Sequence, residues 1–212
     1  MHINIFNRTL FWDIQHKTQN TKTLSDSSFE QMVDGLALSS LLFPKMRILE
    51  IGVGTGKATE QMRERNYKVS ALDISMRALH NVRRFCEKIY TVNRIEFLPS
   101  DYFDLIVCCN VVQHTPTKIL EIQINECMRA LKSTGTFVIQ FVSCGPVDDL
   151  GAVVDPNESE LGCYGRSAHF MERLFATYDG VCSIVSAAKV NIPPVTDSYV
   201  FHVTKVQKHV QE

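Results

Sequence analysis

The stretch Leu49-Glu50-Ile51-Gly52-Val53-Gly54-Thr55-Gly56-Lys57 decides how the rest of the chain is interpreted. Three alternating glycines follow a short apolar segment and precede a segment of helical character. Glycine adopts backbone angles that other residues avoid, and it lets a ligand approach the chain closely. The helix that follows presents free N–H groups and the positive end of its dipole to an anionic group. The stretch therefore predicts a ligand-binding turn between a strand and a helix.

Two ligand classes with similar glycine patterns fit this stretch poorly. A phosphate-binding P-loop needs Gly at position 51 and Ser or Thr after Lys57, but the chain has Ile51 and Ala58 there. A dinucleotide fingerprint that starts from Gly52 needs its third Gly at position 57, which is again Lys57. What remains is an alternating glycine pattern with an acid, Glu50, inside the preceding strand.

Outward from this turn, short apolar segments alternate with helical ones. We expect strands at 47–51, 68–72, 94–98, 104–109 and 135–142, and helices at 57–65, after Ser75, and over the apolar spacing Leu120, Ile124, Cys127 and Leu131. Such alternation predicts a doubly wound α/β fold with a mostly parallel sheet and helices on both faces. A helix at 167–178 and strands at 181–190 and 198–206 follow, so a C-terminal antiparallel strand completes seven strands.

The N-terminal region differs from this pattern. Residues 13–28 are polar and lack a period, whereas residues 29–43 have helix-like apolar spacing that Pro44 stops. We expect residues 1–43 to form a short cap, flexible first and helical second, and residues 44–212 to form the main domain. Residues 143–163 are irregular.

Composition excludes several classes. The chain has 212 residues, with 22 Lys and Arg against 23 Asp and Glu and a net charge of −1, so a basic nucleic-acid or membrane-surface binder is disfavoured. Its seven cysteines form no CxxC pair, which favours reduced thiols over disulfides or a structural zinc site. We expect a cytoplasmic protein with no signal peptide, membrane span or metal.

The stretch Glu50–Gly56 resembles the first motif of the class I S-adenosylmethionine-dependent methyltransferase family. The resemblance implies a Rossmann-like fold, S-adenosyl-L-methionine as cofactor, and a loop that cradles the methionine moiety of that cofactor. The implied contacts come from Glu50, Gly52, Val53, Gly54 and Gly56. The alternative is a glycine-rich turn without a ligand.

Asp73 ends the second expected strand, 21 residues after Gly52. A carboxylate at this place in a doubly wound fold can accept hydrogen bonds from both ribose hydroxyls. The resemblance assigns that role to Asp73 and places Ile74 against the adenine. The alternative is a simple helix cap, because Asp-x-Ser commonly precedes a helix.

Asp101 is a third candidate. The family usually has an acid just after the third strand that binds the adenine amino group, and Asp101 follows the strand expected at 94–98. Asp104, which matches the start of the family's fourth strand, comes only three residues later, so the connection is shorter than usual. Asp101 is therefore either an adenine acceptor or a turn residue.

The segment Phe103–Pro116 is similar to the family's fourth motif. Asn110, with Val111 beside it, would lie at the C-terminal end of the strand and bind the cofactor's ammonium group or the substrate. His114 is a candidate base for an acceptor hydroxyl, or a residue that shapes the loop. Trp12, the only Trp, either contacts the substrate or anchors the cap.

These features predict a methyltransferase that acts on an oxygen or nitrogen atom of a small molecule, such as a sugar or a natural-product intermediate. Val111-Val112-Gln113 after Asn110 departs from the motif of amino-methylating DNA enzymes, so nucleic acid is disfavoured as a partner. Segments 1–43 and 143–170 would form the acceptor pocket. Two alternatives stay open: a non-catalytic cofactor- or partner-binding module, and an NAD-dependent oxidoreductase. The oligomeric state is open, with a homodimer as one expectation.

Overall fold

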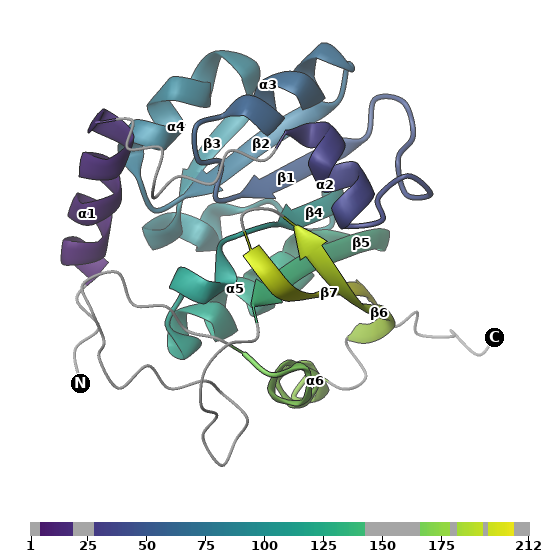
Figure 1. The fold of residues 1–212 in the computed structure, drawn as a ribbon. Coiled ribbons are helices and arrows are strands. Elements are labelled where there is room, and N and C mark those ends of the chain that lie inside the picture. Colours follow the sequence, from purple (N-terminus) through teal and green to yellow (C-terminus); the bar gives the residue numbers. More distant parts are fainter. Residues whose placement is uncertain (1–4, 19–27, 143–165, 179–181, 193–194, 206–212) are drawn as a thin grey trace.

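The computed structural model describes residues 5–18, 28–142, 166–178, 182–192 and 195–205. Seven strands form one sheet in the order β3-β2-β1-β4-β5-β7-β6 (Figure 1). Strands β1 to β5 are parallel to their neighbours, and β7 runs antiparallel to both β5 and β6. The expected doubly wound, mostly parallel sheet with an antiparallel C-terminal strand is confirmed.

The strands lie close to their expected positions, with one exception. Their bounds are β1 Arg47–Ile51, β2 Lys68–Asp73, β3 Lys88–Thr91, β4 Phe103–Cys108, β5 Leu131–Val142, β6 Cys182–Ile192 and β7 Val195–Lys205. The third strand is the exception, because a 3₁₀ helix over Val92–Phe97 occupies most of the segment 94–98 that was expected as strand. The expected strand at 94–98 is therefore wrong, and the connection that leads to β4 runs over residues 92–102.

Helices cover both faces of the sheet. They are α1 Ile5–Thr18, α2 Phe29–Gly35, α3 Lys57–Glu64, α4 Met76–Val82, α5 Thr117–Ala130 and α6 Ala168–Ala176. Alternate residues of each strand point to opposite faces, so Ile48 and Val138 join a core with α2 and α3, whereas Leu49 and Ile139 join a core with α5 and α6. The result is a three-layer arrangement with the sheet in the middle (Figure 1).

The N-terminal segment contains a helix that the sequence did not predict. Helix α1 occupies Ile5–Thr18, where the first part of the cap was expected to have no regular structure. The helical second part is confirmed at α2, which begins with a capping box between Ser28 and Gln31. In Figure 1, α1 stands beside α4, at the edge of the sheet.

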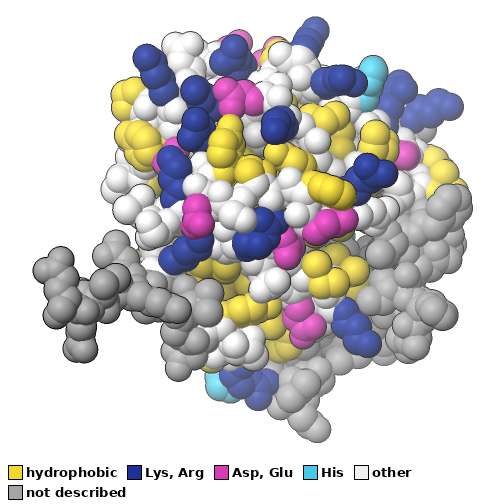
Figure 2. All heavy atoms as spheres, turned by 180° about the vertical axis from the view of Figure 1, so that it is seen from behind, with side chains coloured by type: hydrophobic (Ala, Val, Ile, Leu, Met, Phe, Trp, Pro, Cys, Tyr) yellow, Lys and Arg dark blue, Asp and Glu magenta, His cyan; other side chains and the backbone are white. Residues whose placement is uncertain are grey.

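Acidic and basic side chains are interspersed on the surface. Figure 2 shows the face opposite to that of Figure 1, where Lys and Arg alternate with Asp, Glu and apolar groups over the part that the structure describes. This mixed face differs from the continuous basic stripe of a nucleic-acid-binding surface.

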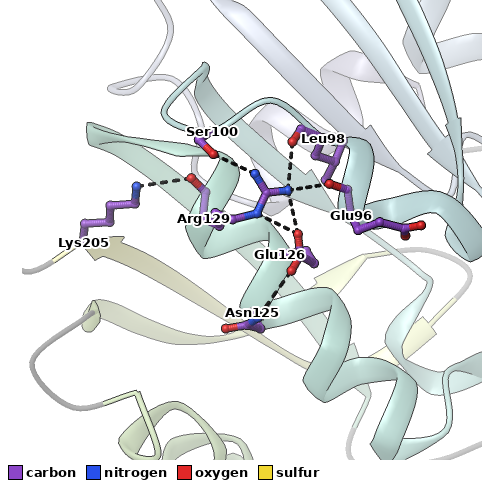
Figure 3. A network of polar contacts seen from close by, with 7 residues as sticks. All are labelled: Glu96, Leu98, Ser100, Asn125, Glu126, Arg129 and Lys205. Carbon is purple, nitrogen blue, oxygen red and sulfur yellow. Dashed lines mark hydrogen bonds and ion pairs between the residues drawn. The ribbon is translucent and has the colours of Figure 1, made fainter.

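Arg129, in the last turn of α5, connects α5 to the segment that leads into β4 (Figure 3). Its guanidinium donates hydrogen bonds to Ser100 Oγ at 2.8 Å and to the carbonyl oxygens of Leu98 at 2.8 Å and Glu96 at 3.1 Å. Glu126, one helical turn earlier, accepts a further bond from Nε at 2.8 Å. Arg129 thereby provides hydrogen-bond donors for backbone carbonyl groups in the irregular segment between β3 and β4.

We expect Arg129→Ala to lower the free energy of unfolding by about 1–2 kcal/mol, because it leaves several carbonyl groups without their partner. Urea denaturation monitored by circular dichroism measures this change. Arg63→Ala, on the exposed side of α3, is the matched control and is expected to change stability by less than about 0.5 kcal/mol. Equal losses in the two variants would contradict the role given to Arg129.

Candidate functional site

Three parallel strands end together at one edge of the sheet. Ile51 of β1 pairs in register with Leu72 of β2 and with Cys108 of β4. The residues that follow these three positions therefore lie side by side. The chain runs from β1 outward to β3 and then crosses back to β4, so β1 and β4 flank the point where the strand order reverses. Ligands of open α/β sheets bind at such a point.

The glycine-rich turn begins at this edge and depends on glycine. Gly52, Gly54 and Gly56 have φ values of 74°, 55° and 90°. A Cβ added at Gly52 would lie 2.1 Å from Cγ2 of Val111, which belongs to the loop after β4. Both the backbone angle and this close approach therefore exclude a larger residue at position 52. The structure thus brings Gly52 and Val111 into contact, and both were expected to contact the cofactor.

Asp73 ends β2 opposite this turn. Its carboxylate is 7% exposed and accepts a hydrogen bond from the Ser75 N–H at 2.8 Å. Burial raises the pKa of Asp73 to about 6, although the backbone N–H groups of Ser75, Val53, Gly54 and Ile74 lower it. Asp73 therefore contacts the glycine-rich turn as well as its own helix cap, and Val53 and Ile74 lie beside it.

Glu50 lies inside β1, beneath the turn. It is 3% exposed, and Thr59 of α3 donates a hydrogen bond to it at 2.5 Å. Burial raises the pKa of Glu50 to about 8, the Thr59 bond lowers it, and the charge of Asp73 raises it further. Glu50 and Asp73 are thus two buried carboxyl groups that interact electrostatically at this edge, and a cation bound beside them would favour their ionised forms.

Helix α1 connects two parts of this edge. Asp13 accepts hydrogen bonds from Ser75 Oγ at 2.5 Å and from the Arg77 N–H at 3.1 Å, both at the start of α4. One residue earlier, the Trp12 ring lies 5.0 Å from the His114 ring, with the two planes at 68°. Trp12 and His114, the expected substrate contacts, are therefore in direct contact and line the same end of the sheet.

Asp101 does not lie at this edge. It precedes β4, whose six residues separate it from Asn110, and it forms an ion pair with Lys205 at 2.6 Å. Its side chain is 68% exposed and its φ is 48°, as in a tight turn. The structure does not support the expectation that Asp101 binds adenine. It supports the alternative, in which Asp101 is a turn residue. The error follows from the misplaced third strand.

Three residues near the site were missed by the sequence analysis. Asp13 gives no signal in sequence, because its contact with α4 spans more than sixty positions. Arg166 is 1% exposed and donates to the Thr115 carbonyl at 3.0 Å, which holds the loop that carries His114. Gln140 gives a detectable signal, a lone amide in the apolar strand Phe137–Val142, and its Oε1 accepts from the Asn110 N–H at 2.6 Å.

The described residues contain no group of three or more His, Cys, Asp or Glu side chains that could hold a metal ion. Likewise, none of the helices in the described part is both long and apolar enough to cross a membrane. The expected acceptor-pocket segment 143–165 and residues 1–4 and 19–27 lie outside the described residues.

Comparison with known proteins agrees with this geometry. Residues 49–139 match the family model described as a methyltransferase domain. The ubiquinone biosynthesis O-methyltransferase of Xanthomonas campestris pv. campestris is 24% identical over 152 residues, which cover 68% of this chain and 61% of that protein. The chain carries a class I S-adenosylmethionine-dependent methyltransferase domain.

Solved structures share the fold of this methyltransferase domain at low identity. A Burkholderia thailandensis 1,6-didemethyltoxoflavin-N1-methyltransferase, crystallised with S-adenosylhomocysteine, has a TM-score of 0.65 and 16% identity and covers 96% of this chain and 88% of its own. A Rhodobacter sphaeroides protein named as a putative zinc-dependent alcohol dehydrogenase has a TM-score of 0.71 and 12% identity and covers 98% and 100%. At these identities the likeness concerns the fold alone.

The residues present fit the cofactor that the methyltransferase family uses. Val111 packs against Gly52 so closely that no Cβ fits there, and the turn remains partly exposed at Gly52 and Gly54. Asp73 offers a carboxylate at the place where a doubly wound fold binds a ribose. Glu50 adds a second buried carboxylate below the turn.

Glu50 is expected to make the stability of the unliganded domain fall as pH rises. Its pKa is about 8 in the folded chain and near 4.5 when unfolded, so between these values the folded state binds more protons. Stability then decreases with pH in this window. We expect Tm to fall between pH 6 and 8.5, and Glu50→Gln to flatten this dependence.

Differential scanning calorimetry across that pH range measures the slope. Glu64→Gln, on the exposed face of the same helix that carries Thr59, is the matched control and keeps the wild-type slope. Parallel slopes for wild type and Glu50→Gln would show that Glu50 is already ionised at neutral pH.

Proposed function

We propose that this protein binds S-adenosyl-L-methionine and transfers its methyl group to an oxygen or nitrogen atom of a small molecule, with a hydroxyl oxygen favoured. The observation that carries the proposal is the pairing of Trp12 and His114 at the same sheet edge as the glycine-rich turn and Asp73. The chain spans less than two thirds of the O-methyltransferase relative described above, and that relative's name supports a hydroxyl acceptor.

The residues of the turn and of β2 supply the cofactor site in this proposal. Gly52 and Gly54 expose backbone to the methionine part, while Asp73 accepts hydrogen bonds from the ribose hydroxyls and Ile74 covers the adenine. The cofactor's ammonium group, bound close to Glu50, would shift this carboxyl toward its ionised form and pair with it. Asn110 and Val111 close the opposite side from the loop after β4.

Methyl transfer depends on alignment of the acceptor atom with the methyl group more than on a covalent intermediate with the protein. When bound, the cofactor supplies an electrophilic methyl group on a positively charged sulfur. The residues at this edge would hold the acceptor oxygen in line with that methyl group and exclude water, and the electron pair of the broken bond would remain on sulfur. His114 takes the hydroxyl proton on a ring nitrogen, and Trp12 packs against the acceptor. Orientation alone can contribute roughly 7–11 kcal/mol toward such a barrier.

A sugar or a natural-product intermediate remains the proposed acceptor class, and both carry hydroxyl groups. The described cysteines are free thiols, which supports the proposed cytoplasmic location. The alternative of a non-catalytic module rested on a shortened connection before β4. Because β3 ends at Thr91, that connection runs over residues 92–102 and no longer favours the module.

We expect Asp73→Asn to weaken S-adenosylhomocysteine binding by at least about tenfold, because an amide cannot accept hydrogen bonds from both ribose hydroxyls with its two terminal atoms. Isothermal titration calorimetry gives the dissociation constant. Asp34→Asn on α2, an exposed site, serves as the control and should bind like wild type. Absence of binding by the wild-type protein would refute the proposed function itself.

His114→Asn is expected to reduce methyl transfer to hydroxyl acceptors by about 10²–10⁴-fold while the affinity for S-adenosylhomocysteine stays within threefold, because only the proton acceptor is lost. A panel of phenols, sugars and amines, assayed by release of S-adenosylhomocysteine, identifies acceptors and rates. His169→Asn, on the exposed surface of α6, is the control. Unaltered turnover in His114→Asn would exclude the base role.

A further inference from the structure

Gln140 is a polar residue in the middle of an apolar strand. Its side chain is fully buried, with 0% exposed, and it follows Val138 on the face of the sheet that α2 and α3 cover. An amide buried without partners is costly, by about 1–3 kcal/mol for each unsatisfied group. Both ends of this amide are satisfied, so its position reflects two specific interactions and not a packing accident.

One end of the amide holds the loop after β4. The parallel pairing between β4 and β5 ends at Cys108 and Ile139, one residue before Gln140. Beyond that point Gln140 Oε1 accepts a hydrogen bond from the Asn110 N–H at 2.6 Å. The side chain thus replaces the backbone partner that the ladder no longer offers to this loop.

Asn110 has a left-handed backbone. Its φ is 59°, a conformation that residues with a side chain adopt less readily than glycine, with Asn among those that tolerate it best. The next residue, Val111, touches the glycine-rich turn at Gly52. A shift of Asn110 would therefore move a side chain that packs directly against the candidate cofactor site.

The other end of the amide reaches β7. Gln140 Nε2 donates to Ser198 Oγ at 2.8 Å, and Ser198 is also fully buried. Ser198 pairs in register with Val142, on the side of β5 away from β4. The chain of contacts runs Ser198–Gln140–Asn110, with one end in the loop after β4 and the other on β7, two strands from β4.

We propose that Gln140 is a positioning residue that sets the left-handed backbone of Asn110, and through it the Asn110–Val111 side of the cofactor site. This inference rests on the proposed function. A terminal amide suits the task because it offers an acceptor toward the Asn110 N–H and a donor toward Ser198. Leucine or methionine in its place leaves both partners buried and unsatisfied.

The two ends of this contact chain provide a matched comparison. Gln140→Met removes both hydrogen bonds, whereas Ser198→Ala removes only the remote one and leaves the Asn110 N–H paired. Gln140→Asn is a milder third variant, which keeps an amide but shortens its reach by one methylene. The probe is S-adenosylhomocysteine, with its dissociation constant measured by calorimetry and Tm measured on the same samples.

We expect Gln140→Met and Gln140→Asn to bind about tenfold or more weakly than wild type, and Ser198→Ala to bind within threefold of it despite a lowered Tm. Hydrogen exchange of the Asn110 amide, followed in the unliganded protein, should be faster in both Gln140 variants and unchanged in Ser198→Ala. A purely structural role predicts instead that affinity follows Tm in all three variants.

Either equal affinity in wild type and both Gln140 variants, or an equal loss in the Gln140 and Ser198 variants, overturns the inference. If Gln140→Met does not fold, Gln140→Asn decides between these outcomes. A wild-type protein that does not bind S-adenosylhomocysteine refutes the proposed function, and the inference with it. Binding by wild type that the Gln140 variants retain refutes the inference alone.

Discussion

The carboxylate of Asp73 beside an open glycine-rich turn is the interaction on which the site depends. Asp73 is buried, yet backbone N–H groups from the turn and from its own helix cap surround it. The turn adopts its left-handed angles because it consists of glycines, and at Gly52 the missing Cβ also makes room for the side chain of Val111. The ends of β1, β2 and β4 lie side by side at this edge of the sheet. The glycine-rich turn, Asp73 and the loop after β4 follow directly from these three ends.

The sequence predicted this edge well, because its information is local. The alternating glycines, the acid at the end of the second strand and the apolar fourth strand can each be recognised from a few consecutive residues. Prediction failed where long-range contacts decide the outcome. Residues 94–98 have strand-like composition but form part of a 3₁₀ helix, held by bonds from Arg129 on α5, and the misplaced strand carried Asp101 to the wrong role. Helix α1 was missed because its contacts with α4 and His114 lie far along the chain.

Helix α1 brings residues of the N-terminal segment into contact with the candidate site. Asp13 contacts the start of α4, next to the proposed ribose carboxylate, and Trp12 contacts the proposed base. One short helix therefore touches both the donor side and the acceptor side of the edge. The same sheet supports many activities in different proteins, so specificity depends on elements added to it, such as α1.

Cys109 follows β4 directly and precedes Asn110, which brings a thiol close to the proposed methyl donor. Burial, with a smaller contribution from Glu50, raises the pKa of Cys109 to about 12. A thiol in this state is a poor nucleophile, since the thiolate is the reactive form. Burial of Cys109 would therefore protect its thiol from methylation by the proposed cofactor.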